Sequence, residues 1–441
     1  MAGARPCLFP KYLFFAHVFI VLFGGIKTGY AQIQGLGDAT GYKPFTATVA
    51  LREGYDSNPL TQSYQTTQPI QSSMYTSVQP SLNYNYLGTQ ADMALRYDFT
   101  GTYYPNINLQ NDILYTQNLI GRYTYKLDPR TSISFADTFL YTEQPFVAQF
   151  VQAGISPTFN TSTINNLATA QGDYRVTDRL SMLTRWNNSV VALGGTQSNG
   201  NYMNNGALQQ FRFDFTPETV GTLTLEYQLY DYDNDNVFRD NQQATFSLGA
   251  DHTFLPNLTF SGRAGVQLND NFGLADNPQI ISGYGLGSGQ IDIQPFPFFS
   301  LSSTWNYDQK SFASAGFSTQ VQQSNLSNVS DSEAYTFNLN WDHYFTDKFS
   351  VIQSFFMNIA TFSPNLSPEQ TESLYPGSQY KGDGQQTTIT YQCKFAYEFY
   401  RYLSAEVGWS YTSYGSYFDV NNSNGGSYTR NTVYFGLRGT Y

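Results

Sequence analysis

The chain ends with Asn431-Thr432-Val433-Tyr434-Phe435-Gly436-Leu437-Arg438-Gly439-Thr440-Tyr441, and polar and apolar residues alternate along this stretch. Val433, Phe435 and Leu437 share one parity, whereas Arg438 lies on the other. Successive side chains of a strand point to opposite faces, so this segment has one apolar and one polar face. Such a C-terminal strand fits the last strand of a transmembrane β-barrel, in which one face meets lipid and the other a wet lumen.

The same alternation recurs through most of the chain, for example over 223–229, 260–268 and 335–341. We therefore predict an all-β fold, a transmembrane antiparallel β-barrel of residues 44–441 with about 18 strands. The alternative is 16 strands, because Pro295 and Pro297 obscure one turn. An even number of strands places both termini in the periplasm.

Connections of two lengths are predicted between the strands, short periplasmic turns and long extracellular loops. The short turns are expected at 87–89, 128–130, 177–179, 216–218, 255–257, 294–296, 346–348 and 400–402. The long loops are expected near 57–72, 143–165, 269–283, 308–331, 361–386 and 413–427.

The N-terminus has the pattern of a signal peptide. Arg5 and Lys11 precede the apolar run 12–23, and Gly29-Tyr30-Ala31 forms a small-x-small cleavage site before Gln32. We predict a signal peptide at 1–31, a periplasmic lead at 32–43 and a location in the outer membrane of a Gram-negative-type envelope. The apolar run is shorter than the roughly 20 residues of a spanning helix.

Charge and cysteine content argue against a nucleic-acid-binding protein and against a disulfide-stabilised one. The chain has 22 basic and 33 acidic residues, and cleavage removes three of the basic ones, which argues against a nucleic-acid partner. Cys7 leaves with the signal peptide, so Cys393 remains alone and no internal disulfide can form.

Aromatic residues gather on the predicted lipid-facing parity just before the short turns. At a membrane interface such rings form a girdle, although aromatic residues also favour strands in general. The predicted girdle consists of Tyr84, Tyr86, Tyr123, Tyr125, Phe213, Phe215, Phe254, Phe345, Tyr397, Phe399 and Tyr441.

Charged residues within the strands fall almost wholly on the inward parity, which leaves the lipid-facing parity nearly free of charge. A lipid-facing Arg or Lys would cost about 2–4 kcal/mol at the bilayer midplane. The predicted lumen-lining residues are Arg52, Arg96, Asp98, Arg122, Arg212, Glu226, Arg263, Asp342, Lys394, Glu406 and Arg438. They predict either a hydrated pore of mixed charge or a lumen filled by loops and ion pairs.

Neither a metal site nor a catalytic site is predicted. The acidic segment 231–240 has oxygen ligands at alternate positions, but it lacks the Gly and the distant Glu of an EF-hand, which favours a solvated loop. The mature chain keeps His252 and His343, both on the outward parity beside a turn, and no Gly-x-Ser-x-Gly motif. We therefore expect neither an enzyme nor a cofactor.

Two segments carry a resemblance to a known family. The stretch 50–59 opens the first strand with Tyr55-Asp56-Ser57-Asn58, and the closing hairpin runs from Tyr402 to Tyr441. Both resemble the outer-membrane β-barrel porins of the second family, uncharacterised barrels associated with exopolysaccharide loci. The resemblance implies the barrel fold and a part in polysaccharide export, and it brings no functional residues. Ser57 stands where the family pattern has an acidic residue.

Three functions follow from these patterns. The first is porin-like passage of small hydrophilic solutes, or a part in exopolysaccharide export. The second is a plugged structural or adhesive barrel that acts through its extracellular loops, and the third is a soluble secreted β-protein such as a sandwich array. The expected partners are outer-membrane lipid, the barrel-assembly machinery through the C-terminal strand, and polysaccharide or small solutes.

Overall fold

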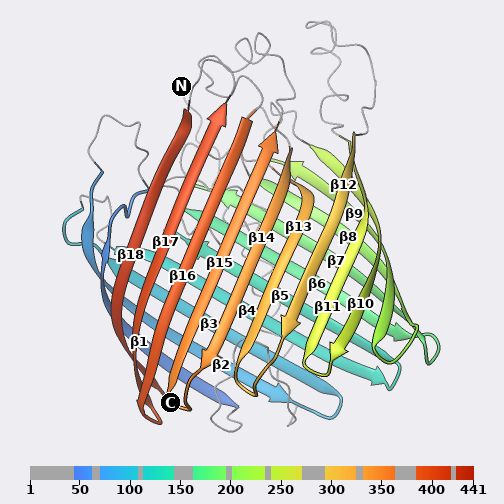
Figure 1. The fold of residues 1–441 in the computed structure, drawn as a ribbon, viewed down its shortest axis with the longest axis horizontal. Helices are drawn as coiled ribbons and strands as arrows, with labels where there is room; N and C mark the ends of the chain where they lie inside the picture. The colour runs from blue at the N-terminus through green and yellow to red at the C-terminus, as the bar shows by residue number, and fades with distance from the viewer. Residues whose placement is uncertain are drawn as a thin grey trace, which may run out of the picture.

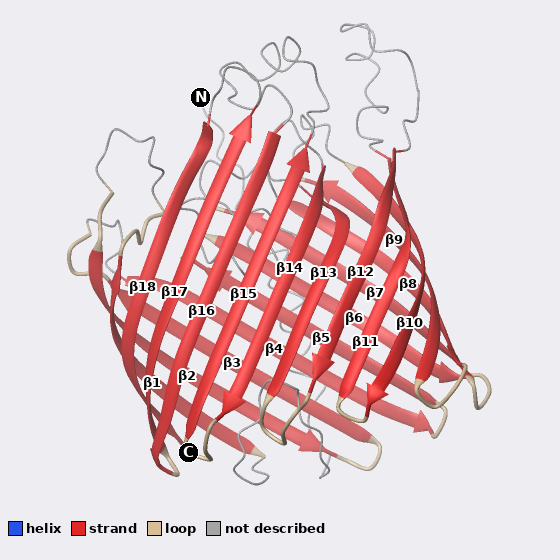
Figure 2. Ribbon diagram, in the orientation of Figure 1, coloured by secondary structure: helices blue, strands red, loops and turns tan. Residues whose placement is uncertain are grey.

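A computed structural model of the chain describes residues 44–61, 70–107, 113–143, 162–194, 201–233, 240–270, 294–323, 331–362, 384–418 and 424–441. The predicted signal peptide, the lead and the acidic segment 234–239 lie outside these ranges. The described part consists of strands, turns and short irregular segments (Figures 1 and 2). Within it, no helix has the length and apolar character needed to cross a membrane.

Eighteen strands make up the described structure. They are β1 (Phe45–Asp56), β2 (Ser73–Leu87), β3 (Ala91–Tyr103), β4 (Ile113–Asp128), β5 (Thr131–Thr142), β6 (Thr163–Arg175), β7 (Leu180–Leu193), β8 (Tyr202–Asp214), β9 (Thr219–Tyr232), β10 (Asn241–Leu255), β11 (Leu258–Asp270), β12 (Gln294–Trp305), β13 (Phe312–Gln323), β14 (Asp331–Tyr344), β15 (Phe349–Phe362), β16 (Gly384–Tyr400), β17 (Leu403–Phe418) and β18 (Asn424–Thr440).

Each strand pairs antiparallel with the next, and β1 also pairs with β18, which closes the sheet into a barrel. The backbones of Ala47 and Tyr441 exchange two hydrogen bonds, Ala47 N–H to Tyr441 O at 3.2 Å and Tyr441 N–H to Ala47 O at 2.8 Å. Closure leaves no exposed sheet edge, and full pairing is what a strand needs in a medium without water. Figure 1 shows β18 beside β1.

The predicted fold class is confirmed: the protein is a closed antiparallel barrel of 18 strands. The 16-strand alternative and the sandwich array are both wrong. One predicted short turn, 294–296, is also wrong, because these residues begin β12. The turn lies instead between β12 and β13, and β13 occupies much of the loop predicted at 308–331.

The two ends of the barrel differ in the length of their connections. At one end, here called the turn end, short segments such as 88–90, 129–130 and 256–257 join consecutive strands, and the chain ends there at Tyr441. The other end is here called the loop end, and every stretch between strands there except 419–423 is longer than the longest turn, 306–311. The predicted alternation of short and long connections is therefore present in the structure.

Register assigns each side chain to one of two faces. At the junction of β1 and β18, Leu51 lies opposite Leu437, and Arg52 lies opposite Gly436. Leu51 and Leu437 point out of the barrel and are 55% and 45% exposed, whereas Arg52 points inward. We call these two surfaces the outer wall and the lumen face. Large apolar residues are exposed all around the outer wall.

Towards the loop end, β12 contains prolines and does not pair with β13, and a glutamine side chain supplies hydrogen bonds to β13 there. Pro295 and Pro297 lie in β12 beyond Phe299, the first residue there that pairs with β13. Proline cannot donate to a sheet ladder. Gln267 of β11 reaches past β12, where its Oε1 accepts the N–H of Val321 at 2.9 Å and its Nε2 donates to the carbonyl of Val321 at 3.4 Å. A buried side chain thus replaces a missing stretch of ladder.

Replacing Gln267 with leucine is expected to lower the free energy of unfolding by about 2 kcal/mol, because both backbone groups of Val321 lose their partner in a buried place. Urea titration of the refolded barrel would measure this change. Gln79→Leu, at a half-buried position of the lumen face on β2, is the matched control and should change little. Equal stability of the two variants would show that Val321 does not depend on Gln267.

Candidate lumen site

Every residue predicted to line the lumen lies on the lumen face, by register with its neighbours. Their function in transport stays a prediction. The structure also shows which of these residues lie together, which parity alone could not give. They form two groups with an excess of positive charge and one sector in which positive and negative charges balance.

The first group, here called the seam group, consists of Arg52, Lys394, Glu406 and Arg438 around the β1–β18 junction. Arg52 Nε lies 2.5 Å from Oε1 of Glu406, and Arg438 Nη2 lies 3.6 Å from Oε2 of the same carboxylate. Lys394 is within electrostatic range of both Glu406 and Arg438. Three cations therefore surround one buried carboxylate, which leaves an excess of positive charge.

An aromatic ring holds the seam group in place. The guanidinium of Arg52 lies 4.5 Å from the ring centre of Tyr434, a cation–π arrangement. Tyr434 in turn covers Gly408, where an added Cβ would collide with the ring. Glycine is thus needed at 408 for the ring to lie flat on the sheet.

The second group, here called the far-wall group, consists of Arg212, Asp251 and Arg263. Nη2 of each arginine lies 3.8 Å from one oxygen of the Asp251 carboxylate. The arginine side chains are 43% and 36% exposed, so they are more accessible than Arg52 at 17%. The strand order places β8 to β11 halfway around the closed barrel from β18 and β1. The two basic groups therefore face each other across the lumen.

A third sector, on β2 to β4, has balanced charge. Arg96 Nε lies 2.7 Å from Asp98, and Lys126 Nζ lies 3.4 Å from Asp92. Ser81 also donates a hydrogen bond to Asp98 at 2.5 Å. The Lys126–Asp92 pair joins neighbouring strands and stabilises the sheet, and both pairs reduce the net field of this sector.

The remaining predicted residues have different surroundings. Arg122 is exposed beside the balanced sector on β4. Glu226 accepts a hydrogen bond from Gln228 Nε2 at 2.8 Å on β9. Asp342 on β14 lies within electrostatic range of Lys394, so it offsets part of the charge of the seam group.

The lumen face is not polar throughout. Two buried apolar clusters lie on it towards the loop end. One is made of Leu140, Val191, Leu193, Tyr202, Tyr230 and Tyr232 on β5 to β9, and the other of Phe356, Tyr414 and Tyr428 on β15, β17 and β18. Sequence parity missed them, because an inward aromatic residue in an alternating strand looks the same as an outward one.

A buried ion pair at the loop end was also missed. Arg430 Nη2 lies 2.6 Å from Oδ2 of Asp56, and the hydroxyl of Tyr104 donates to the same oxygen at 3.1 Å. Asp56 has no exposed surface, and its Oδ1 accepts the N–H of Asn58 at 3.1 Å. These contacts give the Tyr55-Asp56-Ser57-Asn58 motif a structural reason: it joins the first and last strands. No pattern in the sequence connects positions so far apart.

The predicted girdle residues lie towards the turn end, on the outer wall or in the turns. Exposed fractions reach 62% for Phe215, 63% for Phe254 and 76% for Tyr441. Further aromatic rings on the outer wall extend the girdle. Trp341 stacks on His343 at 5.4 Å, and Trp341 Nε1 donates to the hydroxyl of Tyr307 at 2.8 Å.

The outer wall is not as free of charge as predicted. Its charges in the described strands are all carboxylates, namely Glu53, Asp137, Asp231, Asp270 and Glu333. Most lie near the loop end and are hydrogen bonded there, as Glu53 is by Thr76 at 2.8 Å. Asp137 is the exception, because it lies in the middle of β5.

The described residues contain no group of three or more His, Cys, Asp or Glu side chains that could hold a metal ion. His252 and His343 lie on the outer wall, where Nδ1 of His252 pairs with the Thr219 hydroxyl at 2.8 Å and Nδ1 of His343 with the Tyr307 hydroxyl at 2.9 Å. Both histidines are therefore held by hydrogen bonds within the aromatic girdle.

The geometry defines a class of molecule: a closed 18-stranded barrel with an apolar outer wall and a charged lumen face. No family model and no curated protein matches the chain. Solved structures with similar folds include OccK1 (OpdK) of Pseudomonas aeruginosa, at 9% identity and TM-score 0.43, covering 90% of this chain and 99% of that one. Another is the siderophore receptor PirA of the same organism, at 8% identity and TM-score 0.42, covering 91% and 80%. A third is the FrpB iron transporter of Neisseria meningitidis, at 9% identity and TM-score 0.41, covering 91% and 82%.

Proposed function

We propose that this chain is an outer-membrane barrel that passes small hydrophilic solutes and prefers anions. The observation that carries the proposal is the placement of the seam group and the far-wall group on opposite sides of one lumen. Each group has more cations than carboxylates. Rings of basic side chains are a known basis of anion preference in pores.

The outer wall supports a place in a membrane. Leu51, Leu248 and Phe435 are each more than half exposed, and similar residues surround the barrel. A largely apolar surface of this kind is not stable in water, but it suits a lipid core with aromatic rings at its border. In this arrangement the turn end faces the periplasm, and the loop end faces the outside of the cell.

The diameter of the barrel supports a channel. Eighteen strands about 4.8 Å apart, tilted by about 40°, give a backbone diameter of about 36 Å. Barrels of 16–18 strands leave an aqueous channel between their inward side chains. The partly exposed arginines of the far-wall group would line such a channel.

Conductance in planar bilayers tests this function. We expect ohmic single-channel steps and, in a salt gradient, a reversal potential with the sign of anion preference. Migration on a detergent gel with and without boiling identifies folded protein, because a membrane barrel shifts on heating. Folded, inserted protein that never conducts would contradict the proposal.

A specific observation favours one alternative, a plugged structural or adhesive barrel. The apolar clusters around Tyr230 and Tyr428 reduce the polar surface of the lumen at the loop end. Lack of conductance would support this alternative. A role in polysaccharide export is a further proposal that rests on the family resemblance of the first strand and the closing hairpin.

A further inference from the structure

One row of the outer wall does not suit lipid. It crosses β4 to β8 through residues that lie opposite one another in register: Gly121, Asp137, Ala168, Asn188 and Asn205. We call it the polar row. It has three polar side chains, two small residues and no large apolar side chain.

The polar row crosses the middle of the wall at Asp137. This residue is the seventh of twelve in β5, so it lies about 20 Å along the strand from Thr131 at about 3.3 Å per residue. Phe135 and Phe139 flank it on the same face. A carboxylate at this depth is therefore set among lipid-facing rings, where hydrocarbon offers it no hydrogen bond.

The polar side chains are only partly satisfied by one another. Asn166 Nδ2 donates to Oδ1 of Asp137 at 2.8 Å, and Asn188 Nδ2 donates to Oδ1 of Asn205 at 2.9 Å. An amide has two donor hydrogens and an acceptor oxygen with two lone pairs, so each asparagine can make further bonds. The row thus offers both donors and acceptors along one line.

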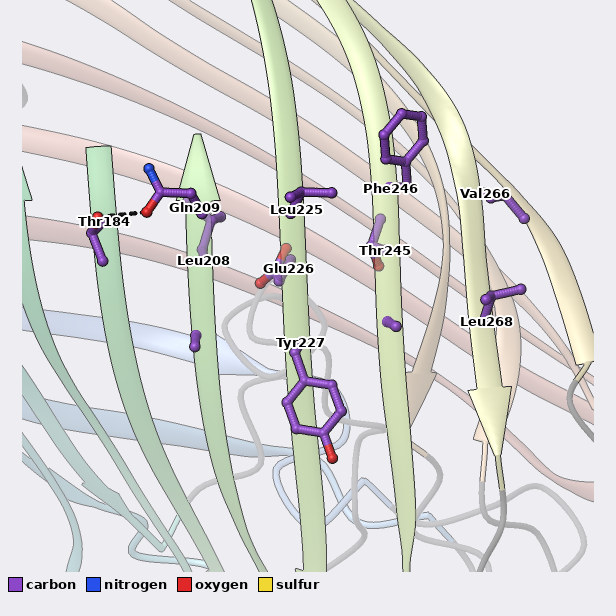
Figure 3. Close-up of a pocket in the computed structure, with 12 residues that line it drawn as sticks. Thr184, Leu208, Gln209, Leu225, Glu226, Tyr227, Thr245, Phe246, Val266 and Leu268 are labelled. Carbon is purple, nitrogen blue, oxygen red and sulfur yellow. Dashed lines mark hydrogen bonds between the residues drawn. The ribbon is translucent and has the colours of Figure 1, made fainter. Parts of the chain in front are cut away.

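Next to the polar row, one large side chain projects from the outer wall, and a groove lies beside it. Trp186 is 48% exposed between Ala170 and Ala207. Beyond it lies a shallow groove of about 460 Å³, with Ala207 and Ala244 among its lining residues. Figure 3 shows the taller side chains around the groove, which include Gln209, Leu225, Tyr227, Phe246 and Leu268.

We propose that the wall formed by β4 to β8 is where a second copy of this chain docks in the membrane. The inference rests on the proposed membrane location. A two-fold contact uses the same patch on both partners, and this patch is self-complementary in polarity, with a carboxylate on β5 and amides on β7 and β8. Amides of one copy can donate to Asp137 of the other, and Trp186 and the groove then lie at the edge of the contact.

Charge favours a second copy over a cationic partner. The described strands carry no Lys or Arg on the outer wall, and the row holds one carboxylate and two amides. A wall built for a cationic partner would carry more negative charge. Small residues at 121 and 168 allow two sheets to approach closely, as small residues do between membrane helices.

The size of the wall fits a stable contact. Five strands about 4.8 Å apart are about 24 Å wide, and the hydrocarbon core is about 30 Å thick. The sector therefore offers about 700 Å² per copy, close to the roughly 800 Å² per partner of a standard protein interface.

Cysteine cross-linking in membranes tests the contact, and the chain provides its own control. Cys393 lies on the outer wall of β16, halfway around the barrel from β7. The test variant combines Asn188→Cys with Cys393→Ser, and the control is the unchanged chain. Oxidation should give a disulfide dimer in the variant and only monomer in the control.

Loss of the polar groups gives a second test. Asp137→Leu combined with Asn205→Leu should raise the dissociation constant of the dimer in detergent about tenfold, because membrane hydrogen bonds are individually weak but add. Heat-dependent migration shows in parallel that the cysteine variant and the double leucine variant are folded barrels. Conductance of the monomer should persist, which separates this inference from the proposed function.

Three results would overturn the inference. The first is a test variant that stays monomeric on oxidation while the barrel is inserted and folded, which would mean that lipid covers the wall. The second is a cross-link from Asn188→Cys to a protein of different mass. The third is an equal yield of dimer from Cys393 in the control, since random collision would then explain the dimer.

Discussion

Replacing Asp56 with alanine is expected to lower the free energy of unfolding by about 3–5 kcal/mol, the usual effect of breaking a buried ion pair. The substitution leaves the guanidinium of Arg430, only 13% exposed, without its carboxylate, and it removes the acceptor of the Tyr104 hydroxyl. The pair joins β1 to β18, so the loss falls on barrel closure. Urea titration of the refolded barrel, followed by the gel shift on heating, measures it.

Asp98→Ala is the matched control, because it also removes a carboxylate that pairs with an arginine on the lumen face. Asp98 is 24% exposed and Arg96 31%, and a solvated pair contributes about 0–1 kcal/mol. Asp56→Leu with Arg430→Met should recover much of the lost stability, since neither charge then stays buried alone. Equal losses for the two alanine variants would mean that the pair does not secure the closure.

Alternation along the strands was sufficient to predict the barrel. In β18, Phe435 and Leu437 were assigned outward and Arg438 inward, and register with β1 agrees. Period-two patterning is local, so a single sequence carries it in full. The same reasoning predicted about 18 strands, with 16 as the alternative, and the described structure has 18.

Prolines caused the main error in the strand boundaries. Gln294, Pro295 and Phe296 have the composition of a turn, yet they form the start of β12. The strand tolerates the prolines because Gln267 supplies the hydrogen bonds that β12 cannot give to Val321. A long-range side-chain contact of this kind has no local signal.

Parity also failed where polar residues occur on both faces. In β6, Asn166 would be assigned inward and Leu167 outward by polarity, but register with Phe139 and Thr138 places them the other way round. The preferences of single residues are weaker than the pairing of the whole strand. The polar row and the apolar lumen clusters therefore became visible only in the structure.

Removing the positive charge of the far-wall group should weaken anion preference more than any other change that spares the fold. We expect Arg212→Gln combined with Arg263→Gln to lower the ratio of anion to cation permeability roughly fivefold. Each charge acts on an ion about 8 Å away with about 0.5 kcal/mol in water, with opposite sign for anions and cations, and salt reduces the sum to about 1 kcal/mol. The reversal potential in a salt gradient measures the ratio.

Removing the negative charge of the far-wall group should raise the anion preference that removing its positive charges lowers. Asp251→Asn frees both arginines from their carboxylate, 3.8 Å from each, and should raise the anion preference. Lys310→Gln is the control, because Lys310 lies in the turn between β12 and β13, beyond the ends of the strands, where it pairs at 2.9 Å with the exposed Asp347. A field set by the lumen charges requires shifts of opposite sign for the first two variants and none for the third. Shifts of the same sign, or an equal shift from Lys310→Gln, would assign selectivity to another part of the barrel.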